Sequence, residues 1–168
     1  MRNLTLSFLF SFSLLATPSW ADEGPCSDDA YRAFDFWLGK WQVTTPDGQH
    51  AGVNEITRAE QGCLLIEQWR GAQGNGGQSY NFYDAASQQW RQVWVSPGII
   101  IDYTGGLVDG AMKLEGEIAY QDMGKSVAFR GTWTPQDDGA VTQHLEQFDP
   151  QMQKWQSWFK GIYRRVED

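Results

Sequence analysis

Two charged residues stand in the middle of segments whose side chains alternate between apolar and polar. Glu67 lies between Leu65 and Trp69, and Arg130 directly follows Phe129. Residues two apart in a strand share one face, so Glu67 is predicted to face the same interior as its apolar neighbours. A charge inside a protein costs free energy unless it is paired. Three interpretations stay open: the two residues pair, Arg130 anchors an acidic group of a ligand, or both face water.

Aromatic side chains recur at the same two-residue spacing. Trp90 and Trp94 share a strand face with Gln92, and Trp69 shares one with Glu67. One interpretation is a solid core, because aromatic side chains bury large areas and a small barrel must be filled. The other is a small-molecule site with aromatic walls and a few polar groups. For the second we predict these ligand-binding residues: Glu67, Trp69, Trp90, Gln92, Trp94, Tyr103, Arg130 and Gln143.

Other catalytic or metal-binding chemistry finds little support in the sequence. No Gly-x-Ser-x-Gly motif is present, and no group of His, Cys, Asp or Glu has the spacing of metal ligands. The run 74–77 is rich in glycine but lacks the strand, lysine and helix of a phosphate-binding loop. We therefore assign no catalytic residue and no metal site, and interpret the loop 71–77 as a mobile rim.

The elements that must position these residues are strands. From Lys40 onward, turn residues separate about ten short alternating segments, which is typical of an antiparallel barrel or sandwich. Short turns between successive strands favour an up-and-down barrel that closes on itself. Ser27 or Asp28 can cap a short helix leading towards Trp37, and Gly105-Gly106 suggests a bend or a bulge. The predicted strands are 40–45, 52–59, 63–70, 78–83, 88–95, 99–103, 111–120, 126–134, 141–148 and 155–166.

The first residues have the features of a secretory signal. Arg2 precedes an uncharged apolar run, Pro18 ends that run, and small residues at Ser19 and Ala21 fit a cleavage site. We predict a signal peptide over 1–21 and one domain over 22–168. The apolar run is short for a membrane span, and no second one follows, so no span is expected after cleavage. A periplasmic or secreted location follows.

Charge and cysteine content agree with export. The chain has 21 acidic and 13 basic residues and a formal net charge of −8, which disfavours nucleic acid as a partner. Its two cysteines, Cys26 and Cys63, most simply form one disulfide in an oxidising compartment. The oligomeric state is not determined by these features.

A family resemblance rests on an ordered series of motifs across the domain. Phe-Asp-Phe-Trp-Leu-Gly-Lys-Trp at 34–41 contains the Gly-x-Trp signature of the lipocalin and wider calycin barrels. Together with Glu67-Gln68-Trp69, Trp90 to Val95, Thr132 to Pro135 and Tyr163, it is similar to a family of exported bacterial proteins. The resemblance implies a lipocalin-like barrel with no assigned activity, so it informs the fold more than the function.

Two site expectations follow from that resemblance. In such barrels the signature Trp, here Trp41, closes one end beneath an Arg of the last strand. Strand alternation over 155–165 places Arg165, rather than Arg164, on the face with Phe159 and Tyr163. Some related barrels bind haem through one His, for which His144 is the candidate. Val141 and Leu145 more readily face inward, which would place His144 outside.

The favoured function is non-catalytic binding of a small apolar or aromatic molecule inside the barrel. The first alternative is an enzyme that acts on such a molecule, with Glu67 as acid or base and Arg130 as an oxyanion or carboxylate partner. The second is a filled barrel that serves as a protein-interaction module through its outer surface.

Overall fold

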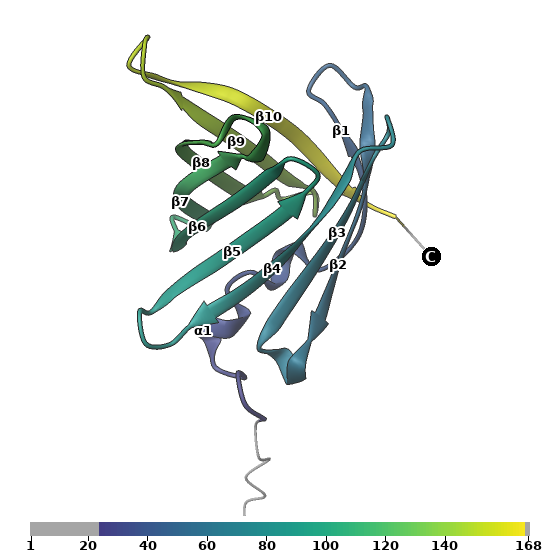
Figure 1. Cartoon of the computed structure of the whole chain (residues 1–168). Coiled ribbons are helices and arrows are strands. Elements are labelled where there is room, and N and C mark those ends of the chain that lie inside the picture. The colour runs from purple at the N-terminus through teal and green to yellow at the C-terminus, as the bar shows by residue number, and fades with distance from the viewer. Residues whose placement is uncertain (1–23, 167–168) are drawn as a thin grey trace, which may run out of the picture.

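The computed structural model describes residues 24–166, which form a closed antiparallel β-barrel of ten strands (Figure 1). Each strand pairs with the next along the chain, and β1 closes the barrel against β10. The predicted all-β up-and-down barrel is therefore confirmed. The strands are β1 Gly39–Thr44, β2 His50–Ala59, β3 Leu64–Gly71, β4 Gly76–Asp84, β5 Gln89–Ser96, β6 Ile99–Val108, β7 Ala111–Tyr120, β8 Lys125–Pro135, β9 Val141–Asp149 and β10 Lys154–Arg165. The predicted signal peptide lies outside the described residues.

Alternation of side chains explains how the strands form one wall. In β7, Met112, Leu114 and Ile118 are buried, whereas Lys113 and Glu115 are exposed. Turns between strands use glycine where the backbone must enter the left-handed region, as at Gly98 and Gly139, both with φ of 79°. Pattern and turns together keep successive strands antiparallel and adjacent.

The N-terminal segment closes one end of the barrel. It contains the helix α1, Asp29–Arg32, and a 3₁₀ turn, Asp35–Trp37, so the predicted helix is two short pieces. The ring of Phe34 stacks on Trp37 at 5.0 Å and meets Trp90 and Trp133 edge-on at 5.6 and 5.4 Å. In Figure 1, α1 lies at the lower end of the barrel. These fully buried rings form what we call the aromatic plug, made of Phe34, Trp37, Trp41 and Trp133.

The disulfide fastens the aromatic plug to the barrel. Cys26 and Cys63 are bonded, as predicted, at a sequence separation of 37. Cys63 follows the short turn Glu60–Gly62 between β2 and β3. The chain before α1 is therefore covalently held to a turn at the closed end.

Arg165 completes the closure. Its guanidinium lies 4.3 Å from the centre of the Trp41 ring, and Nη1 donates a hydrogen bond of 2.7 Å to the carbonyl of Leu38. Trp41 in turn donates from Nε1 to the carbonyl of Trp37 at 2.9 Å. The predicted contact between Trp41 and Arg165 is thus present, whereas Arg164 pairs with Asp138 on the surface.

Two details of the strands differ from the sequence prediction. Gly105 and Gly106 make neither a bend nor a bulge, because β6 continues through them to Val108 with unbroken pairing to β7. In β10 the pairing with β9 shifts between Ser157 and Phe159, a β-bulge. The bulge separates Trp155 and Ser157 from the inward face of Phe159, so the alternation predicted over the whole strand is wrong in its first part. No helix within residues 24–166 is long and apolar enough to cross a membrane.

Candidate functional site

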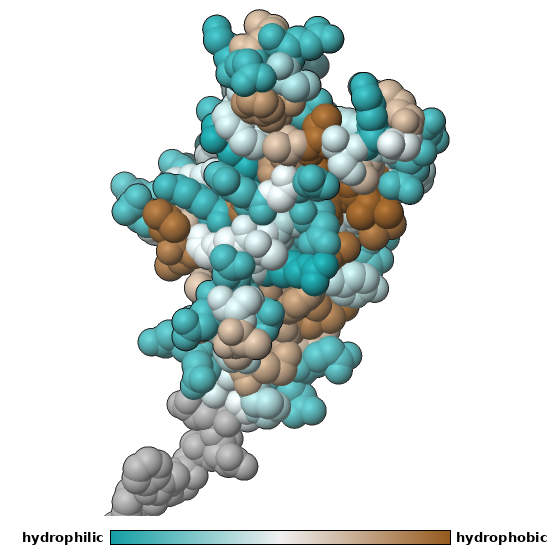
Figure 2. All heavy atoms as spheres, turned by 60° about the vertical axis from the view of Figure 1, so that its left-hand side comes forward, coloured by the Kyte–Doolittle hydropathy of each residue, from teal (hydrophilic) through white to brown (hydrophobic). Residues whose placement is uncertain are grey.

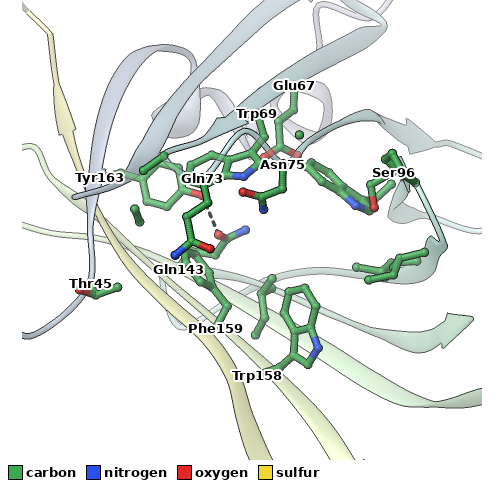
Figure 3. Close-up of a pocket in the computed structure, with 18 of the residues that line it drawn as sticks. Thr45, Glu67, Trp69, Gln73, Asn75, Ser96, Gln143, Trp158, Phe159 and Tyr163 are labelled. Atoms are coloured by element: carbon green, nitrogen blue, oxygen red, sulfur yellow. Dashed lines mark hydrogen bonds between the residues drawn. The ribbon is translucent and has the colours of Figure 1, made fainter. Parts of the chain in front are cut away.

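A cavity of about 640 Å³ occupies the end of the barrel opposite the aromatic plug (Figure 3). The turns between β1 and β2, β3 and β4, and β5 and β6 contribute to its rim. Residues 72–76 line it, which places the glycine-rich segment at the mouth as the sequence predicted. The interior is therefore not solid, and the interpretation as a filled barrel is wrong in this respect.

The walls of the cavity are largely aromatic. Trp69 and Phe159 meet edge-on with ring centres 6.2 Å apart. Trp94 lies against Gly77 of the neighbouring strand so closely that a Cβ there would overlap its ring. Trp158, the extra residue in the bulge of β10, adds a ring that is 43% exposed at the mouth. These rings offer apolar faces to an occupant of the barrel.

Buried polar side chains from several strands form hydrogen bonds beneath these walls. Glu67 accepts from Asn54 Nδ2 at 2.7 Å through Oε1 and from Ser79 Oγ at 2.6 Å through Oε2. Asn81 Nδ2 donates to Ser79 Oγ at 2.9 Å, and Gln92 Nε2 donates to Asn81 Oδ1. We call the whole set the polar belt: Asn54, Glu67, Ser79, Asn81, Gln92, Tyr103, Gln143 and Tyr163.

Two tyrosines of the polar belt donate hydrogen bonds to glutamines on neighbouring strands. Tyr103 donates from its hydroxyl to Gln92 Oε1 at 2.5 Å, and Tyr163 donates to Gln143 Oε1 at 2.6 Å. Figure 3 shows Tyr163 and Gln143 on neighbouring strands at one side of the cavity. Burial, and next the charge of Glu67, raise the pKa of both phenols well above the usual 10. Both tyrosines therefore stay neutral hydrogen-bond donors over the ordinary pH range.

Glu67 is the electrostatic centre of the site. Burial raises its pKa from 4.5 to about 7, although the hydrogen bonds from Ser79 and Asn54 act in the opposite direction. Desolvation disfavours a charged carboxylate, and here it outweighs the two donors. The residues that line the cavity include no lysine and no arginine. Glu67 therefore changes its charge near neutral pH with no lysine or arginine in the lining beside it.

Most of the predicted ligand-binding residues meet around this cavity. Its lining includes Glu67, Trp69, Gln92, Trp94, Tyr103 and Gln143. Trp90 faces inward but belongs to the closed end, where its Nε1 donates to the carbonyl of Ala30 at 2.9 Å. It is not among the residues that line the cavity. The shared face of β5 was thus interpreted correctly, whereas the position of Trp90 along the barrel was not. Ligand binding by the other six stays a prediction.

The structure corrects the predicted position of Arg130. Phe129 and Gly131 are buried beside it, so Arg130 points to the outer face of β8. There its guanidinium makes two hydrogen bonds with Glu146, of 2.8 and 3.1 Å, and lies 4.3 Å from the centre of the Trp155 ring. The predicted pairing with Glu67 and the predicted ligand contact inside the barrel are both wrong, because the apolar neighbours take the inward positions.

His144 also lies outside. Its neighbours Val141 and Leu145 are buried, and its Nε2 is 3.1 Å from Ser157 Oγ on the outer surface. It does not face the cavity, so it is not placed to bind a haem there. Among residues 24–166 no group of three or more His, Cys, Asp and Glu side chains is arranged to hold a metal ion.

Four members of the polar belt were not predicted as site residues from the sequence: Asn54, Ser79, Asn81 and Tyr163. Alternation within β2 and β4 does put the first three on the inward faces, where Ser79 and Asn81 are fully buried. Their small polar side chains are of the types that are common at exposed positions, so the residue types alone did not indicate that they are buried. Trp158 was missed because only the bulge turns it towards the mouth.

Fold and site define an antiparallel β-barrel that is closed at one end and holds an aromatic-walled cavity over a buried carboxylate at the other. A scan against protein-family models finds no match, and a search of curated proteins finds no similar sequence. The cavity and the residues around it therefore carry the functional argument.

Proposed function

We propose that this chain is an exported, non-catalytic barrel that binds a small, largely apolar or aromatic molecule. The observation that carries the proposal is the cavity of about 640 Å³, a size within the range of small-molecule sites. Its aromatic walls supply apolar contact, and the polar belt supplies a few oriented polar groups. The similarity to lipocalin-like exported proteins agrees with this role and is part of the proposal.

Export is supported by the disulfide between Cys26 and Cys63, since such bonds persist in oxidising compartments. We propose a periplasmic or secreted location after removal of residues 1–21. The intact mass of protein recovered from the producing cells would show a mature chain that begins at Asp22.

Dye binding tests the proposed function. N-Phenyl-1-naphthylamine is a neutral aromatic dye whose fluorescence rises in apolar surroundings, and we expect saturable binding to the folded protein. Trp69→Ala removes a wall of the cavity and should weaken binding about tenfold, since a ring contact contributes roughly 1 kcal/mol or more. Trp155→Ala removes an indole from the outer face and should leave dye affinity unchanged. Absence of dye binding, or equal effects of the two substitutions, would contradict the proposal.

A second function, catalysis, is favoured by one observation. The pKa of Glu67 is raised to about 7, near the value at which a carboxyl group can act as an acid or a base at neutral pH. Arg130 is not available as its partner, because it lies outside the barrel. Mass spectrometry of a ligand retained on purification, before and after incubation with wild-type protein and Glu67→Gln, distinguishes turnover from binding.

A further inference from the structure

The cavity lining contains an acidic side chain but no lysine or arginine. Glu67 is the acidic residue in the lining, and its side chain reaches the cavity from β3 (Figure 3). The lining holds no lysine or arginine, and His50 lies on the first residue of β2, at the mouth. An acidic ligand would place its charge near this carboxylate without a basic partner. The sequence-based expectation of an acidic ligand, which depended on Arg130, therefore loses its basis.

The carboxylate of Glu67 has hydrogen-bonding capacity left for an occupant. It accepts one hydrogen bond at each oxygen, from Asn54 and from Ser79. A carboxylate offers about four acceptor positions, so about two stay open. A buried carboxylate without a cation is destabilising, which makes a cationic group the complementary partner.

Aromatic faces stand at the same level as the carboxylate. Glu67 pairs with Ser79, and Ser79 pairs with Trp94 on the next strand, so these three side chains form one row across β3, β4 and β5. Trp69 follows two residues along the same face of β3. Indole faces attract cations, most strongly when water is excluded. The row therefore combines an anionic acceptor with rings that favour positive charge.

We propose that the ligand of this cavity is a protonated amine with an aromatic or apolar body, whose ammonium group binds Glu67 while its body lies against Trp69 and Trp94. This inference rests on the proposed function and specifies its ligand class. It follows from the geometry of the row and from the lack of lysine and arginine in the lining.

The protonation of Glu67 gives the proposal a second signature. An ammonium group needs the ionised carboxylate, so binding should release a proton where Glu67 is protonated in the free protein, below about pH 7. The other groups that face the carboxylate are Tyr103 from β6 and Tyr163 from β10, whose raised pKa values keep them neutral. His50 at the mouth is the remaining titratable group of the lining, so His50→Gln serves as a control for the pH profile.

The test compares three ligands with one ring and different charge: phenethylamine, 2-phenylethanol and phenylacetate. Each is titrated against the protein with bound N-phenyl-1-naphthylamine, and displacement gives the affinity. We expect phenethylamine to bind at least tenfold more tightly than the alcohol at pH 8, and phenylacetate to bind most weakly. The affinity of phenethylamine should fall about tenfold per pH unit well below pH 7, whereas that of 2-phenylethanol should stay nearly constant.

Variants assign the preference to one residue. Glu67→Gln should remove the preference for the amine while keeping the affinity for 2-phenylethanol and the dye. Glu117→Gln makes the same change in net charge on the exposed face of β7 and should behave as wild type. If the dye binds but the amine has no advantage, or keeps it in Glu67→Gln, the inference is wrong and the proposed function stands. If neither the dye nor any of the three ligands binds, both are wrong.

Discussion

Glu67 is the one charged residue among the buried polar side chains of residues 24–166. Its pKa is raised by burial, so the folded protein holds a proton that the unfolded chain releases at lower pH. When folding raises the pKa of a carboxyl group, its contribution to stability is full at a pH below the pKa of the unfolded chain. That contribution is lost as the pH rises through the pKa of the folded protein. For Glu67 this loss of stability takes place between pH 4.5 and about pH 7. At higher pH the ionised group destabilises the barrel, which favours a functional reason for its presence.

Glu67→Gln should remove this pH dependence. The amide is nearly isosteric and cannot ionise, so the variant should gain stability relative to wild type as pH rises. The difference in unfolding free energy should change by about 2–3 kcal/mol between pH 5 and pH 8, from the size of the shift. Urea unfolding at several pH values measures it, with Glu117→Gln as the control that should follow wild type. Parallel curves for Glu67→Gln and wild type would show that the carboxyl titrates normally.

Of the two charged residues singled out in the sequence, Glu67 and Arg130, only Glu67 was placed correctly. Alternation with Leu65 and Trp69 put Glu67 inside, and it lies inside. The same reasoning failed for Arg130, because Phe129 and Arg130 are adjacent and only one of them can face the core. The partners that hold Arg130 outside, Glu146 and Trp155, come from β9 and β10. Alternation within β8 makes that choice, because Phe129 and Trp133 share the inward face and Arg130 falls on the opposite one.

Strand β10 shows where sequence reasoning about whole elements reaches its limit. Its first part and its last part have opposite parity because of the bulge at Trp158. The turns elsewhere contain Gly, Pro, Asp or Asn, so the number and order of the strands were predictable. A bulge has no such signal here: Ser157, Trp158 and Phe159 read as an ordinary alternating segment. The residue it adds to the mouth was therefore not predictable.

The last residues of β10 can be tested by a matched pair of substitutions. Arg165→Ala removes the cation–π contact with Trp41 and the hydrogen bond to Leu38, which should lower the unfolding free energy by about 1–2 kcal/mol. Arg164→Ala removes a surface ion pair with Asp138, in which both side chains are more than half exposed, and should cost less than about 0.5 kcal/mol. Urea unfolding of both variants gives the ranking. The opposite ranking would mean that the packing on Trp41 does not stabilise this end.

At the scale of the whole molecule, the two ends of the barrel differ in structure. The aromatic plug and the disulfide hold one end closed, and the cavity occupies the other. On the face shown in Figure 2 the surface is mostly hydrophilic, with separate hydrophobic patches. The resemblance carried by the Gly-x-Trp motif predicted the closed end, and the cysteine pair predicted the disulfide. It did not determine whether the remaining interior was filled, because that depends on how rings from distant strands pack.

Removing the disulfide should separate stability from binding. The double variant Cys26→Ser, Cys63→Ser frees a closed loop with a sequence separation of 37 residues, which should lower the unfolding free energy by roughly 3–4 kcal/mol in the chain-entropy view. Dye affinity of the fraction that stays folded should be unchanged, since the cavity lies at the opposite end. Unfolding curves and dye titrations at low temperature measure the two quantities. A loss of affinity in fully folded variant protein would show that the plug shapes the cavity.

Four hydrogen bonds of the polar belt point the same way along one arc of the wall. From Tyr103 they run through Gln92, Asn81 and Ser79 to the carboxylate, each group donating to the next. Bonds aligned in this manner polarise one another, so a change in charge at the terminal acceptor strengthens or weakens the whole series. The phenol on β6 therefore serves as a remote reporter of events on β3. Its ultraviolet absorption and its vibrational frequencies should register whether Glu67 is bare, protonated or paired with a cation.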